Sequence, residues 1–289
     1  MSVAVTERID ANGTSIAFSR RGSGLPLILL HGAEADHSMF DAFAALLAPH
    51  FSVLAYDQRD SGGTRNPPTP YGLADLADDA AALIAALGHE RAHVFGTSLG
   101  GVIAQVLAVR HPERVDRLVL SSTFRAGISP LSINPEVFAK LGALRAGLPG
   151  SAAEIARYFF PDGHIARHPE VVGIFSGSSR TADQRQRRAG ILARPIAVDL
   201  GRITAPTLVL AAAEDCLIPP AHTLSLAGEI VGARPETIAG VGHVATIQDP
   251  VAVARPVIAF LQSGVSTRTI GGNHDDLSGG RSRSTPAQG

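Results

Sequence analysis

The sequence predicts an α/β protein in which a mainly parallel, eight-stranded sheet carries helices on both faces. Short continuous apolar runs alternate with helical segments along most of the chain. Such runs are typical of strands that are buried on both faces of a parallel sheet. The composition agrees, because 289 residues with 45% hydrophobic and 18% charged side chains can bury one large core.

Eight runs account for the expected strands. The first two are expected to pair antiparallel around Asn12-Gly13, a dipeptide that favours a two-residue turn. In chain order, the expected strands span Val3–Arg8, Ser15–Arg20, Leu25–Leu30, Ser52–Tyr56, Ala92–Phe95, Arg117–Leu120, Thr207–Leu210 and Glu236–Ala239.

Helical segments fill the intervals between the later strands. Pro112 marks the end of one helix and Pro250 the start of another. The expected helices span Phe40–Leu47, Leu73–Leu87, Leu99–Arg110, Ala221–Val231 and Val251–Gln262.

One segment, residues 124–202, breaks the alternation and divides the core into two halves, 1–123 and 203–263. Because it stands between two sheet strands, we expect it to cover the carboxyl edge of the sheet as a helical lid. Its helical patches span Glu136–Leu144, Ser151–Phe159 and Thr181–Leu192. Its aromatic side chains face either a substrate or a small core of the lid itself. Residues 264–289 hold too little apolar surface to fold and are expected to form a disordered tail.

Charge and cysteine content exclude several classes of function. A net charge of −1 argues against a nucleic-acid surface. The single cysteine, Cys216, excludes an internal disulfide and a multi-cysteine metal site. The sequence has neither the pattern of a signal peptide nor a run of the ~18 apolar residues that a membrane span needs. We therefore expect a cytoplasmic protein with no nucleic-acid or membrane partner; the sequence predicts no particular oligomeric state.

Ser98 is the most informative residue. It lies in the string GTSLGG (residues 96–101), directly after an apolar run and directly before an apolar helical stretch. In this strand–turn–helix context the pattern G-x-S-x-G predicts a nucleophile elbow, whose glycines leave room for a strained serine between strand and helix. The helix starts just behind Ser98, so the N–H of Leu99 can receive an oxyanion. An ordinary glycine-rich turn is the alternative.

A serine hydroxyl needs a base that takes its proton, and an imidazole suits that task when a carboxylate orients it. His243 follows the last predicted strand, and Asp215 follows the strand before it. Both therefore belong to the edge at which open parallel sheets bind ligands. His222 and His164 are the alternative histidines, and Glu214 is the competing carboxylate.

From about residue 14 to residue 262 the chain resembles enzymes of the α/β-hydrolase fold. The resemblance rests on the segments LLHG (29–32), YDQRDSG (56–62), the Ser98 elbow, DCLIP (215–219) and GH (242–243). The chain order Ser, Asp, His is the order that this fold uses.

The resemblance implies roles for individual residues. Ser98 would be the nucleophile, Asp215 the orienting acid and His243 the base, while the N–H groups of Ala33 and Leu99 would form the oxyanion hole. Asp57 and Arg59 would be architectural and hold the loop after their strand. The family usually has a glycine where this chain has Asp60, a substitution that also occurs in some esterase and lactonase branches. Within the family, the elbow and the strand exit Leu120-Ser121-Ser122 resemble enol-lactonase-like enzymes most.

These observations predict a serine hydrolase that cleaves a carboxylic ester or lactone of a small molecule through an acyl-enzyme. No metal or organic cofactor is expected, because activation by His243 supplies what a metal would provide. Tyr158 and Phe159 are the expected substrate contacts. The resemblance to enol-lactonases implies that a lid arginine also contacts the substrate, and the candidates are Arg125, Arg157 and Arg180. The alternatives are a cofactor-free haloperoxidase or perhydrolase, a C–C bond hydrolase, and a slow-turnover binding protein on the same fold.

Overall fold

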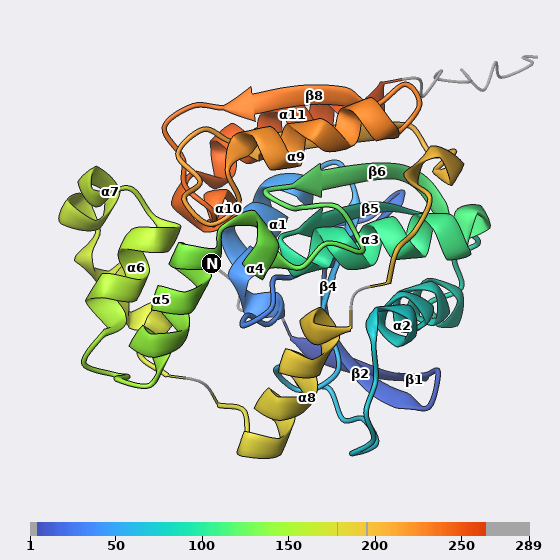
Figure 1. Ribbon diagram of the computed structural model, residues 1–289. Coiled ribbons are helices and arrows are strands. Elements are labelled where there is room, and N and C mark those ends of the chain that lie inside the picture. The colour runs from blue at the N-terminus through green and yellow to red at the C-terminus, as the bar shows by residue number, and fades with distance from the viewer. Residues whose placement is uncertain (1–4, 178, 195, 264–289) are drawn as a thin grey trace, which may run out of the picture.

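The core of the molecule is one eight-stranded sheet with the strand order β1-β2-β4-β3-β5-β6-β7-β8 (Figure 1). The computed structural model describes residues 5–177, 179–194 and 196–263. β2 pairs antiparallel with β1 and with β4, and all other neighbouring strands are parallel. The predicted α/β fold class is therefore confirmed. The strands span β1 (Thr6–Ala11), β2 (Thr14–Arg21), β3 (Pro26–Leu30), β4 (Ser52–Tyr56), β5 (Ala92–Thr97), β6 (Val115–Ser121), β7 (Thr207–Ala212) and β8 (Arg234–Ile238).

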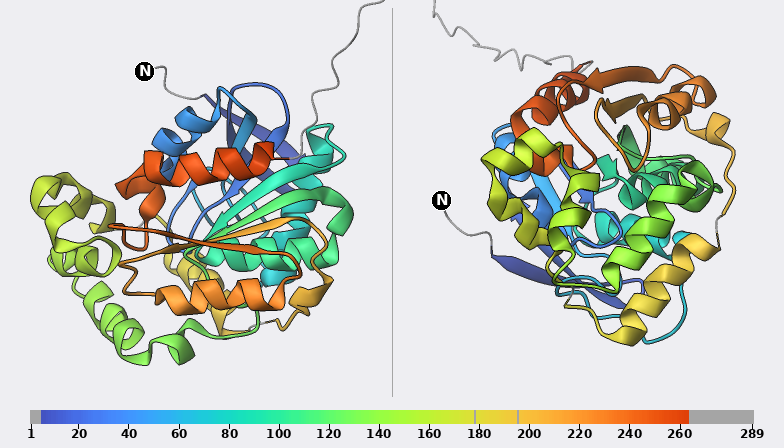
Figure 2. Two further views of the ribbon diagram at one scale, coloured as in Figure 1. Left: turned by 90° about the horizontal axis from the view of Figure 1, so that it is seen from above. Right: turned by 60° about the vertical axis from the view of Figure 1, so that its left-hand side comes forward.

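Helices cover both faces of this sheet (Figure 2). On one face α1 (Asp41–Leu47) contacts α11 (Pro250–Gln262). On the other face α2 (Leu73–Ala86) packs against α3 (Leu99–Arg110), and α9 (Pro220–Glu229) lies against β7.

Strand β3 shows why its sequence is continuously apolar. Leu27 and Leu29 join the apolar cluster that holds α1 and α11, whereas Ile28 and Leu30 join the cluster that holds α2 and α3. Successive side chains of a strand point to opposite faces, so a strand covered on both faces needs apolar residues at every position.

The inserted segment between β6 and β7 contains the expected helical patches and two further short helices. Its helices are α4 (Pro130–Ile133), α5 (Pro135–Arg145), α6 (Ala152–Phe159), α7 (Asp162–Arg167) and α8 (Ala182–Ala193). Short 3₁₀ helices span His37–Phe40, Pro112–Arg114, Pro169–Phe175 and Leu200–Arg202, and a last short helix, α10, spans Ala245–Gln248. The expected tail, residues 264–289, lies outside the described residues.

Most strands begin and end within two residues of the prediction, and two differences have a clear physical reason. The first strand continues to Ala11, beyond the predicted end at Arg8, because the turn at Asn12-Gly13 is two residues long and pairing starts at Ala11 and Thr14. The predicted start at Val3 lies outside the described residues. The last strand begins at Arg234, before Pro235; this is an edge strand, where proline is tolerated. Among the described residues there is no helix with the length and hydropathy of a membrane span.

Candidate active site

Ser98 sits between β5 and α3 with φ 53° and ψ −123°, in the region where a side chain is strained. The neighbouring glycines explain how this turn fits. A Cβ on Gly96 would lie 2.4 Å from the carbonyl oxygen of Gly100, and one on Gly100 would lie 2.0 Å from that of Leu30. Any larger residue would force strand and helix apart, so the turn holds the serine at the carboxyl end of β5.

His243 connects Ser98 to Asp215. Its Nε2 lies 3.0 Å from Ser98 Oγ, and its Nδ1 lies 2.8 Å from Asp215 Oδ2. A carboxylate only accepts hydrogen bonds, so Nδ1 carries the proton and Nε2 is free to accept from the serine hydroxyl. The histidine and the aspartate are 5% and 6% exposed, so the contacts are shielded from water. This arrangement can take the proton from Ser98.

Asp215 is itself held in place by the loop after β7. Its second oxygen, Oδ1, accepts from the backbone N–H groups of Leu217 and Ile218, both at 2.9 Å. The competing carboxylate, Glu214, is exposed. Of the alternative histidines, His222 is exposed on α9, and His164 stacks on Phe160 in the inserted segment.

The loop after β3 brings Ala33 towards Ser98. Gly32 lies beside Ser98, since a Cβ on Gly32 would be 3.6 Å from that of Ser98. His31 is fully buried, and its Nε2 accepts from the N–H of Gln58 at 3.2 Å. Its Nδ1 therefore carries the proton and donates to the carbonyl of Gly32 at 2.7 Å. Burial of the imidazole lowers the pKa of His31 to about 3, so the ring is neutral.

The contact between His31 and Gly32 also orients the N–H of Ala33. A trans peptide is planar, and its C=O and N–H point in opposite directions. Holding the Gly32 carbonyl against the imidazole therefore turns the N–H of Ala33 away from His31. Leu99, the first residue of α3, presents a second N–H that has no partner within the helix.

A cavity of about 500 Å³ opens at Ser98, Leu99 and His243, beneath the inserted segment. Its wall is mostly apolar and includes Phe124, Phe138, Leu148, Ile155, Phe159, Phe175, Leu217 and Ile218. Its charged residues are Glu34, Arg145, Arg180 and Arg185.

Of the two predicted aromatic substrate contacts, the structure brings only Phe159 to this cavity. Phe159 lines the wall, and its ring meets the His243 ring edge to face at 5.8 Å. Tyr158 is not part of the lining and lies near the Lys140 ammonium instead. Adjacent residues of a helix point in different directions, so α6 turns only one of the two aromatic rings into the cavity.

The structure likewise places Arg125 outside this cavity, so the lining gives no support to its predicted contact with substrate. Arg125 forms an ion pair with Glu229 at 2.8 Å and is absent from the cavity lining. Arg157 pairs with Asp162 outside the cavity, whereas Arg180 does reach it. Three further charged residues of the cavity could not be predicted from the sequence, because no motif or periodicity distinguishes Arg145, Arg185 and Glu34 from surface charges.

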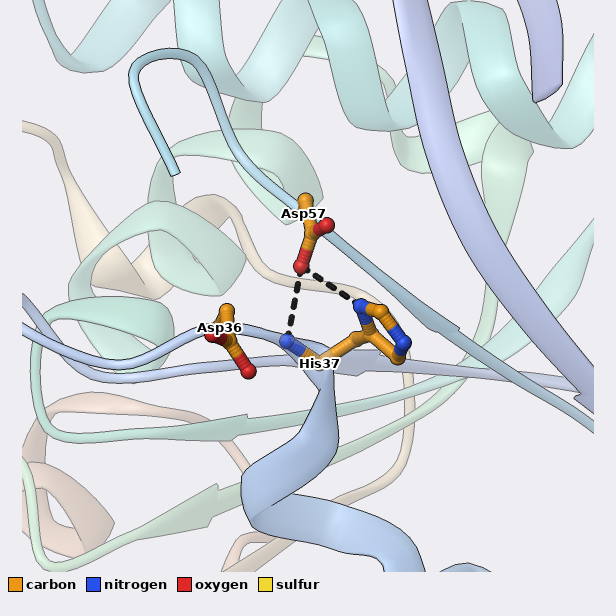
Figure 3. A group of neighbouring side chains, drawn as sticks. All are labelled: Asp36, His37 and Asp57. Carbon is orange, nitrogen blue, oxygen red and sulfur yellow. Dashed lines mark hydrogen bonds and ion pairs between the residues drawn. The ribbon is translucent and has the colours of Figure 1, made fainter. Parts of the chain in front are cut away.

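Asp57, in the loop after β4, joins Asp36 and His37 in a cluster with the composition of a metal site (Figure 3). Its Oδ1 accepts from the N–H and Nδ1–H of His37, both at 2.8 Å, and its Oδ2 accepts from the N–H of Gly63 at 2.7 Å. Burial would raise the pKa of Asp57, but these hydrogen bonds outweigh it and leave the pKa lowered. Both carboxylate oxygens of Asp57 already accept hydrogen bonds from this loop. We therefore interpret the cluster as one that holds the loop in place and not as a metal site.

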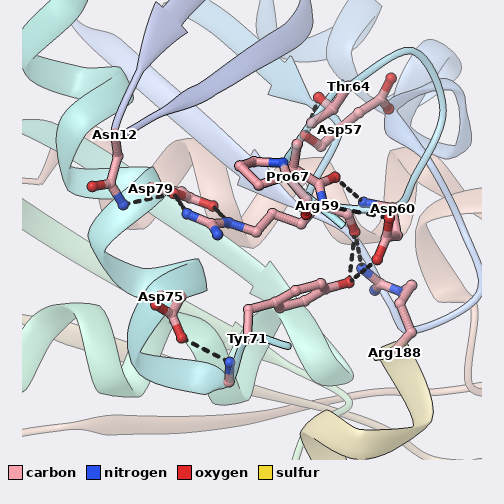
Figure 4. Close-up of polar contacts among 12 residues, drawn as sticks. Asn12, Asp57, Arg59, Asp60, Thr64, Pro67, Tyr71, Asp75, Asp79 and Arg188 are labelled. Atoms are coloured by element: carbon pink, nitrogen blue, oxygen red, sulfur yellow. Dashed lines mark hydrogen bonds and ion pairs between the residues drawn. The ribbon is translucent and has the colours of Figure 1, made fainter. Parts of the chain in front are cut away.

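Asp60 explains the departure from the usual glycine. Its φ is 55°, a left-handed conformation that glycine adopts easily and aspartate tolerates. Its carboxylate accepts from both Nε and Nη2 of Arg187, at 2.7 and 2.8 Å, and from the Tyr71 hydroxyl at 3.0 Å. The preceding residue, Arg59, makes a two-bond contact with Asp79 (Figure 4). Asp60 thus ties α8 of the inserted segment to the core.

The comparisons with known proteins agree with this geometry. The family model described as alpha/beta hydrolase fold matches residues 26–167. Over 227 residues the chain is 32% identical to a Variovorax paradoxus protein provisionally named carbamate hydrolase RutD. This match covers 75% of this chain and 84% of the relative. It is also 32% identical to a poly(3-hydroxyalkanoate) depolymerase of Ectopseudomonas oleovorans, over 82% of this chain and 84% of the relative.

Among solved structures, the enol-lactonase from Burkholderia xenovorans superposes with a TM-score of 0.75 at 27% identity, over 88% of this chain and 99% of that chain. Sequence and structure therefore lead to the same conclusion: the chain belongs to the alpha/beta hydrolase fold family.

Proposed function

We propose that this protein is a serine hydrolase that cleaves the carbonyl–oxygen bond of a carboxylic ester or lactone through an acyl-enzyme. One observation carries the proposal: the continuous hydrogen-bonded line from Ser98 through His243 to Asp215, at 3.0 and 2.8 Å, at the floor of an apolar cavity. A serine has no structural need for such a base, whereas acyl transfer requires one.

In the proposed first half-reaction, His243 Nε2 takes the proton of Ser98 Oγ as the oxygen attacks the substrate carbonyl. The negative charge that develops on the carbonyl oxygen is stabilised by the N–H groups of Ala33 and Leu99 and by the N-terminus of α3. His243 then gives its proton to the leaving alcohol oxygen, and the acyl group stays on Ser98. Asp215 keeps the imidazole in the required tautomer and stabilises its charged form.

In the second half-reaction a water molecule takes the place of the alcohol. His243 removes a proton from the water as it attacks the acyl-enzyme, and the same proton returns to Ser98 Oγ when the acid leaves. These steps balance in protons and electrons, and they need only the water and the side chains already named.

The cavity supports a substrate with an apolar acyl or alcohol part. Its volume of about 500 Å³ is within the range of small-molecule sites, and rings such as Phe138 and Phe159 make up much of its wall. The names of the two relatives include a depolymerase of a polyester and a carbamate hydrolase. Esters, lactones and carbamates all present a carbonyl to the same serine, so all three belong in the test.

The test measures hydrolysis of p-nitrophenyl acetate, butyrate and octanoate, of an aliphatic lactone and of a p-nitrophenyl carbamate, by the wild type and by Ser98→Ala. We expect turnover above about 1 per second on the best ester. We also expect a loss of at least about 10³-fold in Ser98→Ala, with the circular-dichroism spectrum unchanged. Equal rates for the two proteins would reject the proposed nucleophile. Turnover of the carbamate alone would reject ester hydrolysis and keep the nucleophile.

A further inference from the structure

Side chains hold three consecutive carbonyl groups of the loop that carries Ala33. The His31 carbonyl accepts from Nε2 of Gln58 at 2.8 Å, the Gly32 carbonyl accepts from the His31 imidazole at 2.7 Å, and the Ala33 carbonyl accepts from Nε of Arg188 at 2.9 Å. The peptide units on both sides of Ala33 are thereby fixed. A backbone held this tightly around one residue keeps the direction of that residue's N–H.

Gln58 connects these contacts into one network. Its backbone N–H donates to His31, its side-chain NH₂ donates to the His31 carbonyl, and its Oε1 accepts from Nη2 of Arg188 at 3.1 Å. Gln58 is 2% exposed. The Arg188 guanidinium therefore reaches the loop twice, directly at the Ala33 carbonyl and indirectly through Gln58 and His31.

Arg188 comes from a distant part of the chain. It lies on α8 of the inserted segment and is 7% exposed, and its Nη1 donates to the carbonyl of Arg59 at 2.8 Å (Figure 4). Burial lowers the pKa of Arg188 to about 10, so the group remains charged near neutral pH.

The partners of Arg188 distinguish it from an ordinary anchor. Its hydrogen bonds to Ala33, Arg59 and Gln58 all end on uncharged oxygens, and the Tyr71 hydroxyl is a further neutral partner. The Asp60 carboxylate raises the pKa of Arg188 from nearby but accepts its hydrogen bonds from Nε and Nη2 of Arg187. A buried guanidinium without a directly paired carboxylate is costly, because the charge has lost its hydration. Arg187 already anchors α8 to the core through Asp60, so a second anchor would not need a buried guanidinium. Holding three neutral acceptors at once does need one, because the guanidinium has several N–H donors in fixed directions.

We propose that Arg188 is a positioning residue for the oxyanion hole: through the Ala33 carbonyl and through Gln58 it keeps the N–H of Ala33 directed at the oxygen of the reacting carbonyl. The inference rests on the proposed function, because the oxyanion exists only if Ser98 attacks a carbonyl. It also makes the docking of the inserted segment a condition for an efficient site.

The test compares Arg188→Met with Arg187→Met, its neighbour on α8. Both substitutions remove one arginine that links α8 to the core, but only Arg188 contacts the Ala33 loop. For Arg188→Met we expect kcat on p-nitrophenyl butyrate to fall about 10- to 100-fold with KM within about threefold, because a misdirected donor is lost mainly in the transition state. The affinity for an arylboronic acid, whose tetrahedral adduct on Ser98 places an oxygen in the same hole, should fall in proportion to kcat/KM. For Arg187→Met we expect kcat within about twofold of the wild type.

A further readout needs no turnover. Amide hydrogen exchange of a peptide covering residues 31–37 should be faster in Arg188→Met than in the wild type and unchanged in Arg187→Met. If Arg188→Met does not fold, Gln58→Met carries the test, because it breaks the same network while leaving Arg188 its hydrogen bonds to the Ala33 and Arg59 carbonyls, and a kcat loss in the same direction is expected.

Two results would overturn the inference: equal kcat losses in the two arginine variants, or a change in KM alone together with unchanged exchange of residues 31–37. A wild type that neither turns over esters nor binds the boronic acid would instead overturn the proposed function. The exchange comparison would then still decide whether Arg188 orders the loop.

Discussion

Asp215 holds His243 through one carboxylate oxygen while two backbone N–H groups hold the other. The loop backbone therefore fixes the carboxylate independently of the imidazole, and the carboxylate in turn leaves the imidazole one tautomer, with the proton on Nδ1. This explains why one of two adjacent acidic residues can act on the histidine. Asp215 points inward from the end of β7, whereas Glu214 points into solvent.

Asp215→Asn should lower kcat on p-nitrophenyl butyrate by about 10²- to 10⁴-fold, because an amide no longer fixes the Nδ1–H tautomer or stabilises the charged ring. Steady-state kinetics measures this. The matched control is Glu214→Gln, which changes an acidic residue of the same loop and should leave kcat within about twofold. A larger loss of kcat in the Glu214 variant would mean that Glu214, and not Asp215, orients His243.

Asp60→Asn should lower stability at neutral pH by about 1–3 kcal/mol, since Arg187 loses its charged acceptor. Burial raises the pKa of Asp60, but the hydrogen bonds from Arg187 and Tyr71 lower it more, so the folded-state pKa lies below its usual value. A lowered carboxyl pKa contributes stability above the unfolded pKa of about 4, and that contribution is lost as the pH falls through the folded pKa.

Urea unfolding at pH 7, 5 and 3 measures this dependence. The difference between wild type and Asp60→Asn should be largest at pH 7 and should shrink by pH 3. Asp162→Asn is the control, because the Asp162 side chain is 78% exposed in its ion pair and should contribute little at any pH. A difference between wild type and Asp60→Asn that grows on acidification would contradict the assigned ion pair.

Gly100→Ala should destabilise the protein by about 2 kcal/mol or more, because the added Cβ would lie 2.0 Å from the Leu30 carbonyl oxygen. Gly142→Ala serves as the comparison. It lies inside α5 with no atom within 4 Å of a Cβ, so it should raise stability by about 0.5–1 kcal/mol. Chemical denaturation measures both. Equal effects would show that the end of strand β3 and helix α3 are less closely packed beside the elbow than the structure has them.

Ile155→Phe should narrow the acyl specificity. Ile155 is buried and lines the cavity, so a larger ring there takes space from a long chain. Excluding two methylene groups costs about 1.6 kcal/mol, roughly a 15-fold lower ratio of kcat/KM for octanoate over acetate. Tyr158→Ala, on the same helix but outside the cavity lining, should leave that ratio unchanged. A shift of the ratio in the Tyr158 variant would restore Tyr158 as a substrate contact.

The sheet, the elbow and the grouping of Ser98 with His243 and Asp215 could be predicted, because each is marked by a local pattern in the sequence. Apolar runs locate the strands, the glycines at 96 and 100 are required by the packing at Ser98, and the position after a strand selects His243 and Asp215 among similar residues. Apolar content alone predicts the first strand to end at Arg8, whereas the two-residue turn at Asn12-Gly13 sets its register and extends it to Ala11.

The residues of the inserted segment could not be predicted in the same way. Arg125, Arg180 and Arg188 look alike in the sequence, yet the first pairs with Glu229, the second reaches the cavity and the third is buried on the Ala33 loop. Glu229 is 104 positions from Arg125 and Ala33 is 155 positions from Arg188, so only the packing of the segment on the core decides these roles.

Reaction of the intact protein with a fluorophosphonate, followed by mass measurement and peptide mapping, tests directly whether Ser98 is an activated nucleophile. We expect one added phosphonyl group per chain, located on Ser98, and no addition in Ser98→Ala. An unmodified wild type, or a label on another residue, would contradict the claim that Ser98 is a nucleophile activated by His243.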